Sequence, residues 1–104
     1  MECIFLRDIT YIESDGAYSN IYSKGDNQKR MVCRYLKEIQ MHLNNYGFIR
    51  CSRFFLINSK LVENFCSERK TVFVNGEGII VSVRAAKEVF RMLLEMGIKD
   101  TEVS

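Results

Sequence analysis

The sequence contains no proline among its 104 residues, so no proline-rich linker or proline kink interrupts the chain. It also has no apolar run near the length of about 18 residues that a membrane-spanning helix needs, and no basic segment followed by an apolar leader. A chain of this length can bury one hydrophobic core but not two. We therefore expect a single domain over residues 1–104 that is cytoplasmic and makes no contact with a membrane.

Residues that usually carry catalysis or bind metal ions are scarce. His42 is the only histidine, and no motif links it to a nucleophile or a carboxylate. Glycine-rich phosphate-binding motifs are also absent. The cysteines include no CxxC pair of the kind that zinc sites use, and we read them as small core residues, with a redox role left open for Cys51: Cys3, Cys33, Cys51 and Cys66. We expect no enzymatic activity, no cofactor and no metal site.

Charge is distributed unevenly along the chain, although the net charge is only +2. Residues 24–60 hold eight basic and two acidic residues, a net charge of +6. The flanking segments, residues 1–23 and 61–104, carry −3 and −1. A basic middle between acidic flanks can make one face positive, which favours a phosphate backbone. A well-solvated surface with scattered lysines is the alternative.

Short antiparallel strands are predicted by apolar runs that end at turn dipeptides such as Asp15-Gly16 and Asn75-Gly76. We expect strands at residues 4–6, 9–14, 18–23, 30–33, 61–66, 71–74 and 78–81. Helical spacing of apolar residues predicts one helix over residues 36–43 and another over 83–96, capped by Ser82. Strands and helices do not alternate as in a parallel sheet. The predicted fold class is therefore mainly β, with one or two small helices.

Residues 48–58 read FIRCSRFFLIN and place two arginines in an otherwise apolar segment. Strand alternation breaks at Ser52 and Arg53, which predicts a strand, a polar turn with an exposed arginine, and a second strand that ends at Asn58. Arg53 is either a phosphate ligand or an ordinary solvated side chain. Asn58 either contacts a ligand or holds a turn through side-chain to backbone hydrogen bonds.

Assembled in order, these pieces resemble the LytTR family of bacterial DNA-binding domains. The resemblance covers nearly the whole chain and rests on five segments: DITYIE at residues 8–13, Gly16-x-Tyr18, Leu36-Lys37-Glu38, FIR at 48–50 leading to Leu56-Ile57-Asn58, and Val81-Ser82-Val83-Arg84. It implies an elongated arrangement of the strands, with loops that enter neighbouring major grooves of DNA. The leading strand of the family is reduced here to Met1–Cys3, which suggests that the domain is truncated at its start.

The resemblance also implies which residues contact DNA. The implied base contacts are Ser19, Asn20, Asn58 and Arg84, and the implied phosphate contacts are Lys24, Arg50, Arg53 and Lys60. Arginine can donate two hydrogen bonds to guanine, and asparagine can pair with adenine. Alternatively, Arg84 is an exposed side chain without a ligand in the first turn of the last helix, although a cation there opposes the helix dipole. The chain departs from the family at Ser52, where a histidine is usual, and at Phe54, where a serine is common.

The expected function is sequence-specific binding of double-stranded promoter DNA, as the output domain of a bacterial two-component response regulator that controls transcription. An N-terminal receiver domain would then lie outside this chain, and a homodimer would bind direct repeats. The alternative from another class is a protein-interaction or dimerisation module without DNA readout. An RNA-binding β module is a third interpretation, disfavoured because no exposed aromatic pair of an RNP motif is recognisable.

Overall fold

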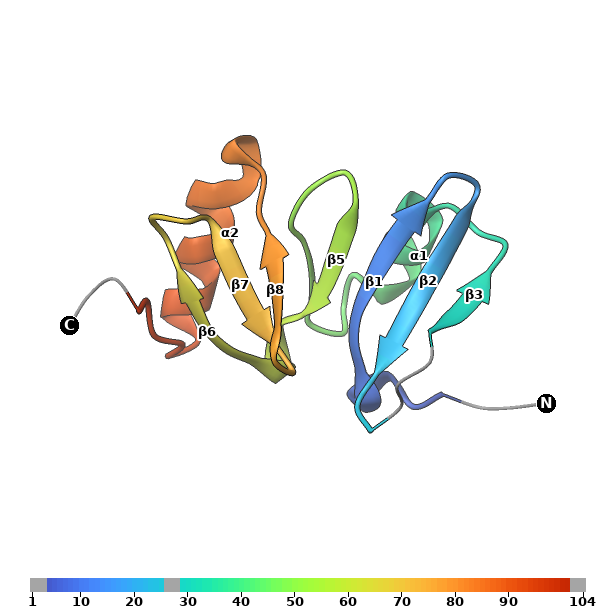
Figure 1. Ribbon diagram of the computed structural model, residues 1–104, viewed down its shortest axis with the longest axis horizontal. Helices are drawn as coiled ribbons and strands as arrows, with labels where there is room; N and C mark the ends of the chain where they lie inside the picture. Colours follow the sequence, from blue (N-terminus) through green and yellow to red (C-terminus); the bar gives the residue numbers. More distant parts are fainter. Residues whose placement is uncertain (1–3, 26–28, 102–104) are drawn as a thin grey trace.

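The computed structural model describes residues 4–25 and 29–101 and shows two small antiparallel sheets in this part of the chain (Figure 1). The larger sheet has the strand order β3-β2-β1-β5-β4, and the smaller has β6-β7-β8. The strands are β1 (Ile9–Asp15), β2 (Tyr18–Ser23), β3 (Arg30–Val32), β4 (Phe48–Arg50), β5 (Phe55–Asn58), β6 (Val62–Cys66), β7 (Thr71–Val74) and β8 (Glu77–Ile80). The predicted mainly β fold class is confirmed.

The larger sheet is built around β1, which pairs with β2 on one side and β5 on the other. Gly16 closes the β1–β2 hairpin with a φ of +63°, a conformation that glycine adopts without steric cost. Helix α1 (Leu36–Leu43), predicted with these bounds, covers one face of the sheet and lies behind β1 and β2 in Figure 1. Its apolar side buries Leu36 and Leu43 against Ile12 and Leu56, which form a core of their own.

The smaller sheet packs against helix α2 (Val83–Glu95). Ser82 caps the helix as predicted, because its side chain accepts a hydrogen bond from the Ala85 N–H at 3.2 Å. The rings of Phe65 and Phe90 stack with centroids 4.9 Å apart and join β6 to the helix. Ile57 of β5 and Cys51, directly after β4, belong to this same core, which therefore connects the two sheets.

The molecule is elongated, as predicted, with principal extents of 46 × 27 × 23 Å. The pairs Asp15–Tyr18 and Glu13–Phe55 place the β1–β2 turn and the loop between β4 and β5 at the same end of the strands. The start of α2 lies at this end too, along the upper edge of Figure 1. We call it the loop end. Ile9, Ser23 and Asn58 mark the opposite end.

The N-terminal segment differs from the prediction. Residues 4–6 do not form a strand, because the chain instead turns through the 3-10 helix η1 (Leu6–Asp8), where the Asp8 N–H donates to the Phe5 carbonyl at 2.9 Å. A second 3-10 helix, η2 (Ser59–Leu61), links β5 to β6. The connection between the predicted strands at residues 18–23 and 30–33 lies partly outside the described residues, and the reduced strand at Met1–Cys3 lies wholly outside them. Neither α-helix of the described chain is long and apolar enough to span a membrane.

Candidate nucleic-acid interface

A hollow of about 750 Å³ opens at the loop end, between the β4–β5 loop and the start of α2. We call it the arginine groove. Its lining contains three arginines and, among the described residues, no carboxylate: Arg50, Ser52, Arg53, Phe54, Phe55, Ile80, Ser82, Arg84 and Ala85. The groove therefore combines positive charge with apolar surface. The predicted segment 48–58 supplies one wall, and Val81–Arg84 with its neighbours supplies the other.

Residues 48–58 form the predicted strand, turn and second strand, with the β4–β5 loop as the turn. Its base is closed by a hydrogen bond from the Cys51 N–H to the Phe55 carbonyl at 2.9 Å. Within the loop, the Phe54 N–H donates to the Ser52 hydroxyl at 3.1 Å. The serine that replaces the usual histidine of the resembled family thus supports the turn through a local side-chain to backbone bond.

Two further backbone hydrogen bonds fix this loop to β1 and to the start of α2. The Ser14 N–H at the end of β1 donates to the Phe54 carbonyl at 2.8 Å. The Ser82 N–H, directly before α2, donates to the Cys51 carbonyl at 2.9 Å. Arg53 and Arg84 are therefore carried by segments that are hydrogen-bonded to each other, so their relative position is set by the fold.

Arg50 does not fit the predicted role of a phosphate contact. Its Nε donates to the Ser52 carbonyl at 2.6 Å, its Nη1 to Gln40 Oε1 at 2.7 Å, and its Nη2 to the Arg53 carbonyl at 2.9 Å. Partial burial lowers the pKa of the Arg50 guanidinium. All three nitrogens are thus used inside the protein, and Arg50 holds the loop in shape.

Arg53 and Arg84 are exposed, and neither donates a hydrogen bond to another described residue. The Arg53 guanidinium lies over the Phe54 ring, with Cζ 5.6 Å from the centroid. Arg84 lies in the first turn of α2, where a cation does not stabilise the helix dipole. The guanidinium groups of these two residues are available to a ligand in the groove.

Three predicted base contacts are buried. Ser19, Asn20 and Asn58 are 0%, 1% and 2% exposed. The Ser19 hydroxyl donates to the Arg34 carbonyl at 2.7 Å. Asn58 Nδ2 donates to the Ile9 carbonyl at 2.9 Å, and its Oδ1 accepts from the Lys60 N–H at 3.1 Å, which is the turn-holding alternative. These side chains have no surface to offer to a base, so the structure does not support the predicted contacts.

Lys24 and Lys60 lie at the end of the strands opposite the arginine groove. Lys24 follows Ser23, which pairs with Ile9, and its Nζ lies 3.9 Å from a carboxylate oxygen of Asp8. Lys60 lies two residues after the end of β5, within η2. These two predicted phosphate contacts therefore belong to a different surface from Arg53 and Arg84.

The β6–β7 turn supplies two cations that the sequence prediction missed. The Val81 N–H donates to the Lys70 carbonyl at 2.8 Å, which brings Arg69 and Lys70 beside the start of α2. Because residues 61–104 carry a net charge of −1, the charge summed over this segment did not indicate the basic pair. The Arg69-Lys70 dipeptide within a predicted turn was the available signal.

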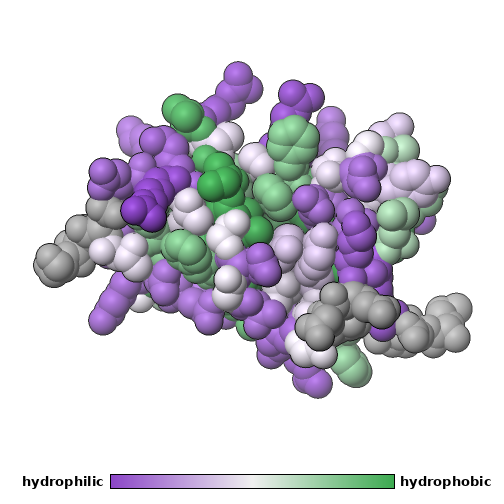
Figure 2. All heavy atoms as spheres, in the orientation of Figure 1, coloured by the Kyte–Doolittle hydropathy of each residue, from purple (hydrophilic) through white to green (hydrophobic). Residues whose placement is uncertain are grey.

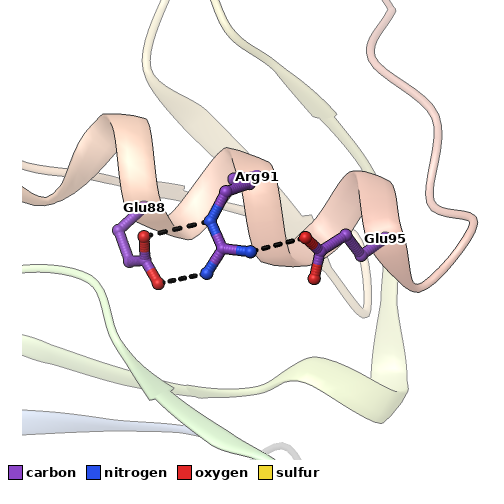
Figure 3. A network of polar contacts seen from close by, with 3 residues as sticks. All are labelled: Glu88, Arg91 and Glu95. Carbon is purple, nitrogen blue, oxygen red and sulfur yellow. Dashed lines mark hydrogen bonds and ion pairs between the residues drawn. The ribbon is translucent and has the colours of Figure 1, made fainter.

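Farther along α2, the exposed surface is no longer basic. Arg91 Nε donates to Glu88 at 3.1 Å and Nη1 to Glu95 at 2.5 Å (Figure 3). The hydrogen bond with Arg91 lowers the pKa of Glu88, and the bonds from both glutamates raise the pKa of Arg91. Two carboxylates around one guanidinium leave this patch net negative. The basic surface of α2 is thus confined to its first turns.

The Cys51 thiol is buried at the base of the loop, and burial raises its pKa to about 12. A thiol with this pKa stays protonated and unreactive at neutral pH. We expect iodoacetamide at pH 8 to label the exposed Cys33 in the native protein but to label Cys51 and Cys66 only after unfolding. Peptide mass spectrometry would report each site. Rapid native labelling of Cys51 would contradict its burial and reopen the redox role.

The raised pKa of the Cys51 thiol also predicts how the free energy of unfolding depends on pH. The pKa of the Cys51 thiol is higher in the folded than in the unfolded chain, where it is near 9.0. Its contribution to stability is fully present below pH 9 and is lost as the pH rises toward about 12. Urea unfolding between pH 8 and 11 should show a falling free energy of unfolding. Cys51→Ala should make that fall shallower, and an unchanged slope would contradict the assignment to Cys51.

A basic groove formed by loops of two small antiparallel sheets defines a β-type nucleic-acid-binding domain. The family model described as the LytTr DNA-binding domain matches residues 1–94, and the chain belongs to this family. It is a family of DNA-binding domains and not of enzymes. Among the described residues, no group of three or more His, Cys, Asp or Glu side chains could hold a metal ion.

A solved structure with the same fold supports this assignment. It is a LytTr DNA-binding domain from Bacillus cereus whose parent protein is described as a methyl-accepting/DNA response regulator. It superposes with a TM-score of 0.66 at 24% sequence identity and covers 88% of this chain and 84% of the other. No curated protein sequence matches the chain. The resemblance inferred from the motifs is therefore confirmed at the level of family and fold.

Proposed function

We propose that this domain binds double-stranded DNA in a sequence-specific manner, as the output domain of a bacterial response regulator that controls transcription. The arginine groove carries the proposal, because it gathers the free guanidinium groups of Arg53 and Arg84 on a preorganised surface whose described lining includes no carboxylate. Family membership supports the DNA ligand, and the parent of the Bacillus cereus domain supports the regulatory context. The chain would act in the cytoplasm, downstream of a receiver domain, and a homodimer would bind direct repeats.

The positions of the side chains divide the proposed roles. Arg53 and Arg84 bind base edges, because a guanidinium can donate two hydrogen bonds to O6 and N7 of guanine. Arg69 and Lys70 contact phosphates, which contribute affinity and register but little sequence information. Arg84 keeps the role that the sequence predicted, whereas Arg53 moves from phosphate contact to base contact. Arg50 becomes a positioning residue.

Selection of bound duplexes from a random pool would test the proposal. We expect a common sequence that binds at least 1,000-fold more tightly than random duplex, and an affinity that falls steeply as salt rises because counterions are released from the phosphates. Fluorescence anisotropy at several salt concentrations would measure both. No enriched sequence together with a salt-insensitive oligomer would contradict DNA readout and support the protein-interaction alternative.

The hydrogen bonds of Arg50 predict a loss of specificity without the loss of a direct DNA contact. In Arg50→Ala the carbonyls of Ser52 and Arg53 lose their donor, the loop loosens, and Arg53 is no longer held toward the groove. We expect the preference for the selected site to fall about tenfold, corresponding to loss of one to two hydrogen bonds from a charged group. Anisotropy against selected and random duplexes would measure this preference.

Gln40→Leu provides the matched control for Arg50, since it removes only the bond to Nη1 and leaves the two bonds to the loop carbonyls. It should keep most of the preference. If Arg50→Ala instead weakened binding to selected and random duplexes by the same factor, Arg50 would be an ordinary phosphate contact.

A further inference from the structure

The arginine groove has apolar walls as well as charged ones. Phe54 on the β4–β5 loop and Ile80 at the end of β8 both line it, and they remain 54% and 58% exposed. Figure 2 shows hydrophobic spheres over β8 and the start of α2, and a separate group over the β4–β5 loop. Exposure of large apolar side chains to water costs free energy, and a ligand that covered them would recover it. Because these side chains lie beside guanidinium groups, the groove suits a ligand that offers both apolar groups and hydrogen-bond acceptors.

The Phe54 backbone is held in a fixed position. Its N–H is bonded to the Ser52 hydroxyl and its carbonyl to the Ser14 N–H, so the backbone is held on both sides. The ring also supports the Arg53 guanidinium at 5.6 Å. Charge and apolar surface are thus displayed as one unit, and little conformational freedom would be lost when a ligand binds.

A DNA major groove offers the matching pair of features. The edge of a guanine presents two acceptors to a guanidinium, and the 5-methyl group of thymine is an apolar group on a base edge. Exposed arginines with no described carboxylate in the lining favour a polyanion over an apolar protein segment, and membership of a DNA-binding family favours DNA over an acidic one. A thymine next to a bound guanine would place its methyl group beside the neighbouring apolar side chain.

We propose that Phe54 and Ile80 are specificity-determining residues that contact thymine 5-methyl groups next to the guanines bound by Arg53 and Arg84. This inference rests on the proposed DNA-binding function and deepens it. It assigns a role to the apolar part of the groove, which hydrogen bonding to bases leaves unused. It also predicts the composition of the recognised site, with thymine and guanine at adjacent positions.

The test replaces single thymidines of the selected duplex by deoxyuridine, which lacks only the 5-methyl group. At one or two positions we expect wild-type affinity to fall roughly three- to fivefold, as loss of one buried methyl group predicts. Phe54→Ala should abolish the effect at one position, and Ile80→Ser at the other. Fluorescence anisotropy would measure affinity, and circular dichroism would verify that each variant is folded.

Leu94→Ala is the matched control, since Leu94 is 56% exposed on α2 and does not line the arginine groove. It should keep both the affinity and the deoxyuridine effects. A selected site without thymine, no effect of deoxyuridine at any position, or effects that persist in both groove variants would overturn the thymine assignment while DNA binding stands. Failure to select any sequence would instead overturn the proposed function itself.

Discussion

Arg84→Ala is expected to lose most of the preference for a selected DNA sequence. The Arg84 side chain is exposed in the arginine groove and makes no hydrogen bond to another described residue, so its removal leaves the fold intact. A bidentate arginine–guanine pair contributes about 1–3 kcal/mol of discrimination, which corresponds to roughly 5- to 150-fold. Anisotropy titrations against the selected duplex and against a duplex with the guanine replaced would measure this loss.

Arg91→Ala is the control on the same helix. Arg91 is held by Glu88 and Glu95, so its loss should leave DNA preference unchanged. Arg69→Ala should weaken binding to all duplexes alike and reduce the salt dependence by about one charge. If Arg84→Ala also weakened all duplexes equally, Arg84 would be a phosphate contact and the base readout would have to come from another residue.

Phe65→Ala is expected to cost about 3–5 kcal/mol of the free energy of unfolding, the range for a fully buried phenylalanine. The Phe65 side chain is 0% exposed and stacks on Phe90, so its loss opens a cavity between β6 and α2. A domain of this size has roughly 5–15 kcal/mol in total, and the variant would lose a large part of it. Urea unfolding followed by circular dichroism would measure the difference.

Phe54→Ala removes the same ring from an exposed position and should change stability by less than about 0.5 kcal/mol. The pair of variants separates the structural phenylalanine from the one assigned to the groove. A loss below about 1 kcal/mol in Phe65→Ala would contradict the packing of α2 on the smaller sheet. In that case the position of Arg84 would also come into question.

Most of the fold could be predicted from local patterns. Turn dipeptides such as Asp15-Gly16 and Asn75-Gly76 require unusual backbone angles, so they marked the hairpins directly. Both helices had apolar residues at helical spacing, and Ser82 capped the second. Residues 4–6 were assigned wrongly, because a short apolar run has no periodicity that separates a strand from a turn.

The site was harder to predict, because it depends on which side chains the tertiary structure uses internally. Arg50 ends β4 and Arg53 lies in the loop that follows, yet the Arg50 guanidinium is occupied by hydrogen bonds to backbone carbonyls and the Arg53 guanidinium remains available. Asn58 ends a strand, where exposure is common, but its amide binds the Ile9 carbonyl across the sheet. Family motifs mark positions that matter to the fold as well as those that contact DNA, and sequence alone does not separate the two.

The bond from the Ser82 N–H to the Cys51 carbonyl ties the β4–β5 loop of the larger sheet to the start of α2, which packs on the smaller sheet, so the two halves of the molecule are interdependent. A chimaera that exchanged only the smaller sheet and α2 with a relative would have to rebuild this link, which sets the position of Arg84 relative to Arg53. If the proposed function holds, new DNA preferences are therefore more accessible through substitutions at the groove surface, at positions 53, 54, 80 and 84, than through exchange of whole segments. The architecture favours gradual changes of specificity at single base pairs.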